Sequence, residues 1–232
     1  MEFLGKLSLF IHIVVGISTL IAGPIALFYN RNTKKHKIAG KVFFYSMAVV
    51  VITSFTGFIK HPTVIFYQFL LFIGILVGFH IIRGFRAIFF MKGSLQPTFF
   101  DRQWAWMAII SGILMLGTAA YHLTTEAHIA FPILFGVFGL GSLADGRYFL
   151  RLLSVQKLDR RWWFQLHINS MFAAFMASTT AFAVNAASFA PWYIQWFAPT
   201  LILLPLQLYL LKKRKVSRKD LGNPFAEVTV TG

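Results

Sequence analysis

"GILVGFHIIRGFRAIFF" (residues 74–90) indicates the fold class most clearly, because it is apolar almost throughout and yet contains His80, Arg83 and Arg86 toward its end. These three polar residues are spaced so that a helix would bring them to roughly one face. Apolar runs long enough to cross about 30 Å of hydrocarbon recur along the whole chain. The stretch therefore indicates one span of a membrane protein, with polar groups gathered near one end of the helix.

The composition supports the same interpretation over the full length. Of the 232 residues, 57% are hydrophobic and 12% are charged, with a mean hydropathy of +0.68. Soluble domains contain about 25% charged residues. We therefore expect an all-α integral membrane protein, a bundle of seven transmembrane helices over residues 1–211, followed by a basic cytoplasmic tail over residues 212–232. The expected spans cover about residues 7–29, 42–60, 64–84, 104–124, 129–149, 163–187 and 192–211.

The distribution of basic residues predicts the orientation. If the N-terminus is outside, 20 of the 22 Lys and Arg residues fall in inner segments, and only Lys6 and Lys60 lie outside. Such a bias sets the orientation of bacterial membrane proteins, so we expect a cytoplasmic C-terminus in a bacterial inner membrane. A net charge of +15 would suggest nucleic-acid binding in a soluble protein. Here the charge is scattered over four segments, which excludes that partner and favours anionic lipid on the cytoplasmic side.

Four histidines fall inside the expected spans, in two layers. His12 and His122 lie toward the outer side, and His80 and His167 lie toward the inner side. Ionisable groups within spans usually face the interior of the bundle and mark a functional path. Two imidazoles from facing helices are a common ligand pair for haem b. The pattern predicts a membrane redox protein in which these two pairs bind haem and pass electrons to or from a quinol or a partner protein.

A metal ion is the alternative that the same residue type allows. If His36, His80 and His167 converge, they form a three-imidazole site suited to zinc or copper, in a metalloenzyme or a metal carrier. The chain has no cysteine, which excludes thiolate ligands and cysteine-bound iron–sulfur clusters. A third alternative is a non-catalytic membrane subunit in which the histidines are structural.

The inner layer also contains charged and amide groups that could form a polar pocket at the inner face. Its members are Arg83, Asp145, Arg147 and Asn169. A carboxylate in a low dielectric needs a cationic or hydrogen-bonding partner, and Arg83, Arg147 or His80 could each pair with Asp145. Such a pocket could accept a quinone, haem propionates or another anionic headgroup, or it could be an ion-pair collar at the membrane interface.

Three motifs carry a resemblance to a known group of proteins. They are "LFIHIVVGISTLIAGPIALF" (residues 9–28), "HKIAGKVFFYSM" (residues 36–47) and "HINSMFAAFMASTTAFAVN" (residues 167–185). With them the chain resembles a family of bacterial polytopic proteins of unknown function, and the resemblance implies a shared site at His12, His36, Gly40 and His167. In layout alone, the sequence is distantly similar to transmembrane di-haem cytochromes b.

Other membrane functions lack their sequence features. The seventh expected span has no lysine for a retinal Schiff base. No expected span has the acidic ring or filter-like loop of a conventional ion channel. The chain also has no Gly-x-Ser-x-Gly sequence, which argues against an acyl hydrolase.

Overall fold

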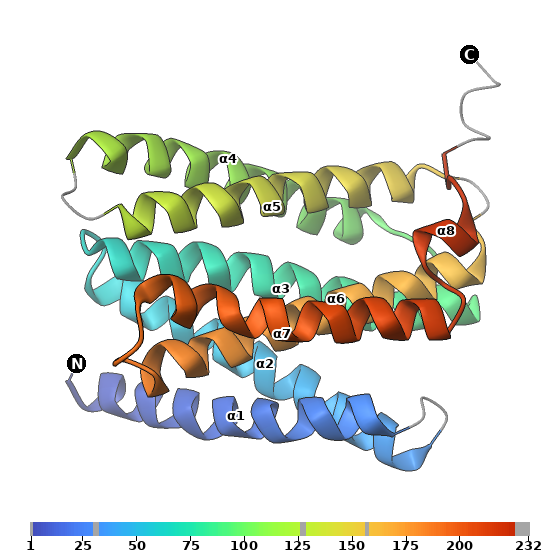
Figure 1. Ribbon diagram of the computed structural model, residues 1–232, viewed down its shortest axis with the longest axis horizontal. Helices are drawn as coiled ribbons and strands as arrows, with labels where there is room; N and C mark the ends of the chain where they lie inside the picture. Colours follow the sequence, from blue (N-terminus) through green and yellow to red (C-terminus); the bar gives the residue numbers. More distant parts are fainter. Residues whose placement is uncertain (1, 30–32, 126–128, 156–157, 226–232) are drawn as a thin grey trace. The chain divides into compact units, whose positions relative to one another are not determined.

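The computed structural model describes residues 2–29, 33–125, 129–155 and 158–225. Throughout these ranges the regular structure is helical, as the composition predicts (Figure 1). The helices are α1 (Glu2–Phe28), α2 (Lys34–Lys60), α3 (Ile65–Lys92), α4 (Phe99–Thr125), α5 (Ala130–Leu153), α6 (Arg160–Ala186), α7 (Trp192–Lys213) and the short α8 (Arg218–Leu221).

Each of the seven expected spans coincides with one of the helices α1 to α7, so the all-helical class is confirmed. Within the described residues, six helices are long and apolar enough to cross a membrane, namely α1 to α5 and α7 with α8. Helix α6 is not among them, because Gln165, His167 and Asn169 lower the apolarity of its first half. The six spans make the chain a multi-pass membrane protein.

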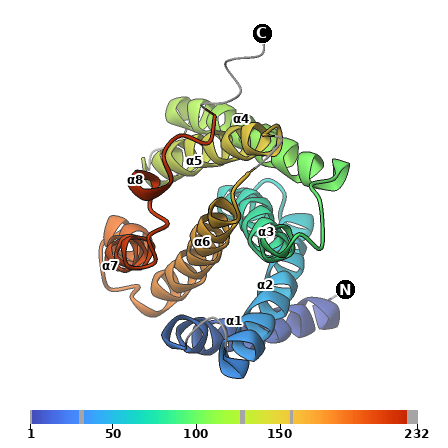
Figure 2. The same cartoon turned by 90° about the vertical axis from the view of Figure 1, so that its right-hand side faces the viewer.

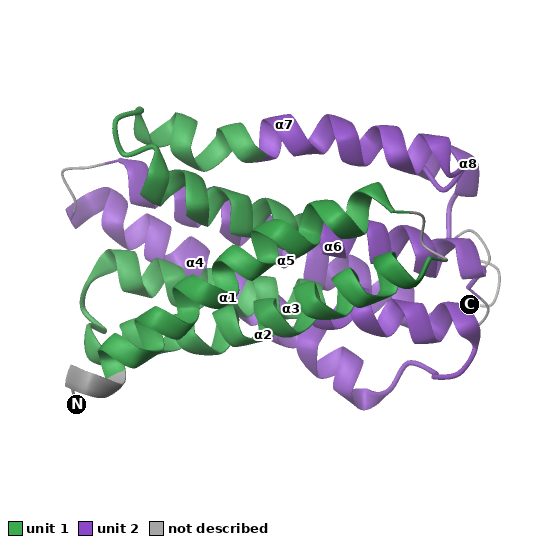
Figure 3. Ribbon diagram, turned by 90° about the horizontal axis from the view of Figure 1, so that it is seen from below, with its two compact units in different colours: residues 1–81, 173–199 green, residues 82–172, 200–232 purple. Residues whose placement is uncertain are grey.

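The contacts divide the chain into two compact units, which Figure 3 colours separately. Unit 1 comprises residues 1–81 and 173–199, and unit 2 comprises residues 82–172 and 200–232. The boundaries fall inside α3, α6 and α7, so each of these helices contributes residues to both units.

Unit 1 is built on α1 and α2, which lie side by side (Figures 1 and 2). The ring of Phe175, from the second half of α6, meets the ring of Phe43 edge-on at a centroid distance of 6.3 Å. Phe175 also lies over Gly23 of α1, where an added Cβ would be 2.5 Å from the ring. A larger residue at position 23 would therefore require the Phe175 ring to shift.

Unit 2 contains the antiparallel pair of α4 and α5, which also lie side by side (Figures 1 and 2). Their axes approach closely at glycines. A Cβ added at Gly112 would lie 2.7 Å from the carbonyl oxygen of Gly139, and one added at Gly146 would lie 2.8 Å from that of Ala105. Small residues at such contacts allow the close packing by which membrane helices associate.

A salt bridge joins the end of α3 to the start of α4. The Nη2 of Arg86 lies 2.7 Å from a carboxylate oxygen of Asp101, and its Nε contacts the other oxygen. The same carboxylate accepts from the backbone N–H of Thr98 at 2.8 Å, which is the capping-box position three residues earlier. The side chain of Asp101 is only 1% exposed, so the carboxylate of this pair is removed from water.

The chain after α7 turns back onto α6. The N–H of Val216 donates to Leu211 O and the N–H of Lys215 donates to Lys212 O, both at 3.0 Å, and Lys215 has a φ of 53°. These bonds form a Schellman motif with a lysine at the left-handed position. Val216 is buried, and its carbonyl accepts from Nε2 of Gln165 at 2.9 Å. The start of the basic tail is therefore packed within unit 2.

Candidate functional site

A buried arginine lies where three helices of unit 2 converge. Arg83, on α3, is 3% exposed. Its Nε donates to the hydroxyl of Ser170 on α6 at 2.9 Å, and its Nη2 lies 3.4 Å from Asp145 on α5. The guanidinium also lies 5.7 Å from the centre of the Phe149 ring. The buried charge is thus held by a hydroxyl, a carboxylate and an aromatic face.

The Ser170 hydroxyl should contribute measurably to stability. Ser170→Ala would leave Nε of Arg83 without this acceptor, so we expect the free energy of unfolding to fall by about 1.5–3 kcal/mol. Ser178→Ala is the matched control, because the Ser178 hydroxyl bonds only to Phe175 O of its own helix among the described contacts. Equilibrium unfolding in detergent micelles measures both, and equal effects of the two substitutions would contradict the role of Ser170.

The remaining members of the predicted inner pocket are placed differently. Of the partners that the sequence allows for Asp145, Arg83 forms the ion pair. Arg147 is exposed on α5, two residues further along. Asn169 accepts a hydrogen bond from Nε2 of Gln207 at 2.8 Å through its side-chain oxygen. Asn169 therefore belongs to a second polar group, which lines a cavity.

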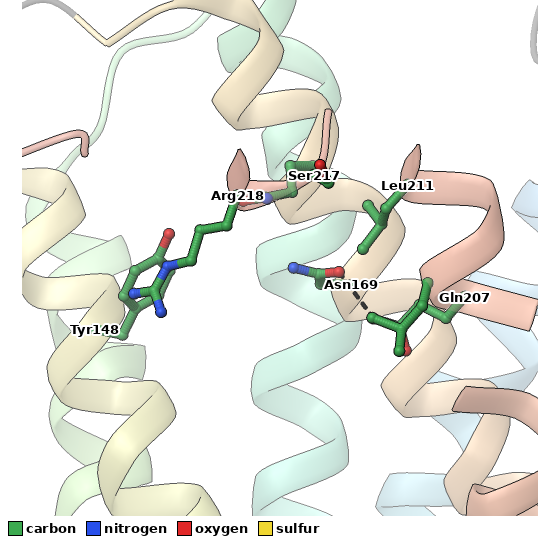
Figure 4. A pocket seen from close by; sticks show the side chains of 8 residues that line it. Tyr148, Asn169, Gln207, Leu211, Ser217 and Arg218 are labelled. Atoms are coloured by element: carbon green, nitrogen blue, oxygen red, sulfur yellow. Dashed lines mark hydrogen bonds between the residues drawn. The ribbon is translucent and has the colours of Figure 1, made fainter. Parts of the chain in front are cut away.

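The cavity lies within unit 2 and has a volume of about 390 Å³. Its polar lining comes from α5, α6, α7 and the turn into α8, and consists of Tyr148, Gln165, Asn169, Gln207, Ser217 and Arg218. Two leucines of α7, Leu208 and Leu211, complete it. In Figure 4 the amide nitrogen of Asn169 is directed toward the side where Arg218 extends beside Tyr148. A cavity with convergent polar groups is the usual form of a small-molecule site.

His167 lies on the same helix as Asn169 and is oriented by the backbone of α3. Its Nδ1 is 2.9 Å from Gly84 O. A carbonyl only accepts, so Nδ1 carries the proton and the lone pair of the ring lies on Nε2. The contact depends on Gly84, because a Cβ there would lie 2.8 Å from Cβ of Ser170.

Two histidines of unit 1 are in the same tautomer as His167, with Nδ1 directed at an oxygen. Nδ1 of His36 donates to Ala26 O at 2.8 Å. Nδ1 of His12 lies 2.8 Å from the hydroxyl oxygen of Thr53, whose own proton is directed at carbonyls of its helix. In both rings Nδ1 is therefore the donor and Nε2 bears the lone pair. This is the tautomer in which imidazoles ligate metals and haem iron, with the second nitrogen held by an oxygen.

The other two intramembrane histidines are more deeply buried. His80 is 7% exposed and lies beside Phe79 on α3, and His122 is 9% exposed and stacks on Phe135 of α5 at 6.4 Å. In each predicted haem pair, one histidine belongs to unit 1 and the other to unit 2. His12 and His80 are in unit 1, whereas His122 and His167 are in unit 2.

A bare metal centre finds no support in the described part of the chain. Over these residues, no group of three or more His, Cys, Asp or Glu side chains is arranged to hold a metal ion. Among these residues, His36, His80 and His167 therefore do not form the metal site that the sequence offered as an alternative.

Several residues of the site are absent from the sequence-based expectation. Gln165 lies four residues before Asn169, so a helical polar stripe would have indicated it. Outside the site, Thr98 and Asp101 have the spacing of a capping box, which would have indicated the start of α4. Gln207 is an isolated amide in an apolar helix, and Arg218 is one of many basic residues in the tail. Neither gives a distinguishing signal.

Comparison of the chain with family models, with curated proteins and with solved structures finds no match.

Proposed function

We propose that the protein is a membrane redox protein that binds b-type haem through imidazoles of its long helices and exchanges electrons with a quinol or a partner protein. The observation that carries the proposal is the shared tautomer of two of the proposed ligands. His12 and His167 each direct Nδ1–H at an oxygen of the chain and carry the lone pair on Nε2. An imidazole fixed in this way is prepared to ligate iron.

The proposal includes the topology. Helix α6 would be the seventh span despite its polar first half, because its polar groups are engaged within the protein, as Ser170 and Asn169 illustrate. With seven spans, the excess of basic residues would put the N-terminus outside and the C-terminus in the cytoplasm of a bacterial cell.

Haem would supply one-electron chemistry when bound. The haem would be held by ring nitrogens of His12, His122, His80 and His167, and Thr53 and Gly84 would hold two of these rings in orientation.

A difference spectrum tests the proposal. Protein purified from cells supplied with haem should show a Soret band and a reduced-minus-oxidised signal of a low-spin b-type cytochrome. His167→Gln or His12→Gln should each remove about half of the bound haem, because each would disable one bis-histidine site. His61→Gln is the control, since His61 is exposed and lies between two spans. A wild-type protein without a Soret band would rule out the proposal.

A non-catalytic membrane subunit is the second candidate, and one observation favours it. The bonds from His36 to Ala26 O and from His167 to Gly84 O also fasten helices together, which is sufficient reason for a half-buried histidine. This candidate predicts that His167→Gln lowers the melting temperature and leaves the absorption spectrum unchanged. A zinc or copper protein would instead show bound metal in elemental analysis of untagged protein.

A further inference from the structure

The charged side chain that lines the unit 2 cavity is cationic. Among the described residues that line it none is acidic, the carboxylate of Asp220 is bonded to Ser217, and Arg218 contributes a cation. Arg218 lies 5.9 Å from the centre of the Tyr148 ring, so its guanidinium is positioned along the cavity wall and not extended away from the protein. The wall therefore favours an anion.

The hydrogen bonds of the lining determine which groups face the cavity. The side-chain oxygen of Asn169 accepts from Gln207, so its amide nitrogen is directed toward Arg218 and Tyr148 (Figure 4). Gln165 uses its own amide nitrogen to bond Val216 O. The amide nitrogen of Asn169, the Tyr148 hydroxyl and the Arg218 guanidinium are all donors. Together they match a group with several acceptor oxygens and a negative charge, such as a phosphate.

The remaining wall is apolar and reaches the surface of the protein. Leu208 and Leu211 come from the last turns of α7, just before Lys212 and Lys213. Leu208 is 56% exposed, so this wall continues onto a lipid-facing helix surface. An amphiphile whose charged part meets donors and whose hydrocarbon part follows α7 fits this arrangement.

We infer that the cavity is a binding site for the phosphate headgroup of an anionic membrane lipid, with Arg218, Asn169 and Tyr148 as the recognising groups. Its volume of about 390 Å³ lies within the range of small-molecule sites, which is roughly 300–1,000 Å³. The inference is independent of haem binding. It differs from a general attraction of the basic tail to the membrane, because it assigns the contact to three named side chains of the cavity, of which only Arg218 belongs to the tail.

Native mass spectrometry of the detergent-solubilised full chain, titrated with defined lipids, tests the inference. The wild type should retain phosphatidylglycerol at concentrations where phosphatidylcholine is lost. Arg218→Gln should weaken this retention about tenfold, because it removes one charge-assisted hydrogen-bond donor. The matched control is Lys219→Gln, which removes the same charge from the next residue outside the cavity lining. Leu208→Trp, at an exposed lining position, should block the site without disturbing the core.

The results separate specific from general binding. Equal loss with Arg218→Gln and Lys219→Gln would overturn the inference in favour of non-specific electrostatics. Retention of ubiquinone in preference to phosphatidylglycerol would overturn it as well. Soluble glycerol phosphate should compete weakly, since it lacks the part that follows α7. Competition as strong as that of the lipid would show that the headgroup alone is the ligand and would contradict a lipid site.

Discussion

Arg86→Gln is expected to lower the free energy of unfolding by about 3–5 kcal/mol, the largest loss that we predict for a charged residue. The substitution leaves the carboxylate of Asp101, which is 1% exposed, without its cation. Asp101→Asn should be less harmful, because Arg86 is 19% exposed and can reach water, and because the amide oxygen can still accept from the N–H of Thr98.

The difference in unfolding free energy between these two variants shows which member of the pair is less able to reach water once its partner is removed. Arg102→Gln is the control for the loss of a positive charge, since Arg102 is an exposed residue of the same turn. It should change stability by less than about 0.5 kcal/mol. Equilibrium unfolding in mixed micelles gives all three values, and a wild-type-like Arg86→Gln protein would mean that the pair contributes nothing.

Gly112→Ala is expected to destabilise the protein by about 3 kcal/mol, at the upper end of the cost of overpacking. The added methyl group would lie 2.7 Å from two backbone atoms, Gly139 O and Leu143 N. Backbone atoms of a packed helix cannot move aside as a flexible side chain can, so α4 and α5 would have to separate along their length.

Two other glycines of the same helices provide matched controls. A Cβ at Gly117 of α4 or at Gly141 of α5 meets no atom within 4 Å. Gly117→Ala and Gly141→Ala should therefore be neutral or slightly stabilising, because alanine is the better helix former. Thermal unfolding of the three variants in one detergent checks the comparison. A Gly112→Ala protein that melts with the controls would contradict close packing at this position.

The helices were predictable from the sequence because the length of an apolar run is a local property. Their ends were not. Helix α3 continues to Lys92, past the expected end at residue 84, because a helix can leave the hydrocarbon and keep its backbone hydrogen bonds. Arg83 and Arg86 therefore lie within the helix, each with a carboxylate partner, and do not mark its end.

From the sequence, the polar site could be predicted only as a set of residue types at the same depth in the membrane. The sequence allowed Arg83, Arg147 or His80 as the partner of Asp145, and the choice of Arg83 depends on which helices are neighbours. Arg147 was a poor candidate on geometric grounds, because residues two apart on a helix point in widely different directions. The cavity could not be predicted at all, since it is completed by Gln207 and by a turn that follows α7.

The Schellman turn after α7 has a consequence for the electric field at the membrane surface. Val216 and Gln165 fasten this turn, so the lysines and arginines of residues 212–219 begin from a fixed point and not from a freely moving tether. At physiological ionic strength their field decays over about 8 Å. Charges anchored in this way act on the headgroups immediately beside them. A mobile tail would spread the same electrostatic potential over a wider area of the bilayer.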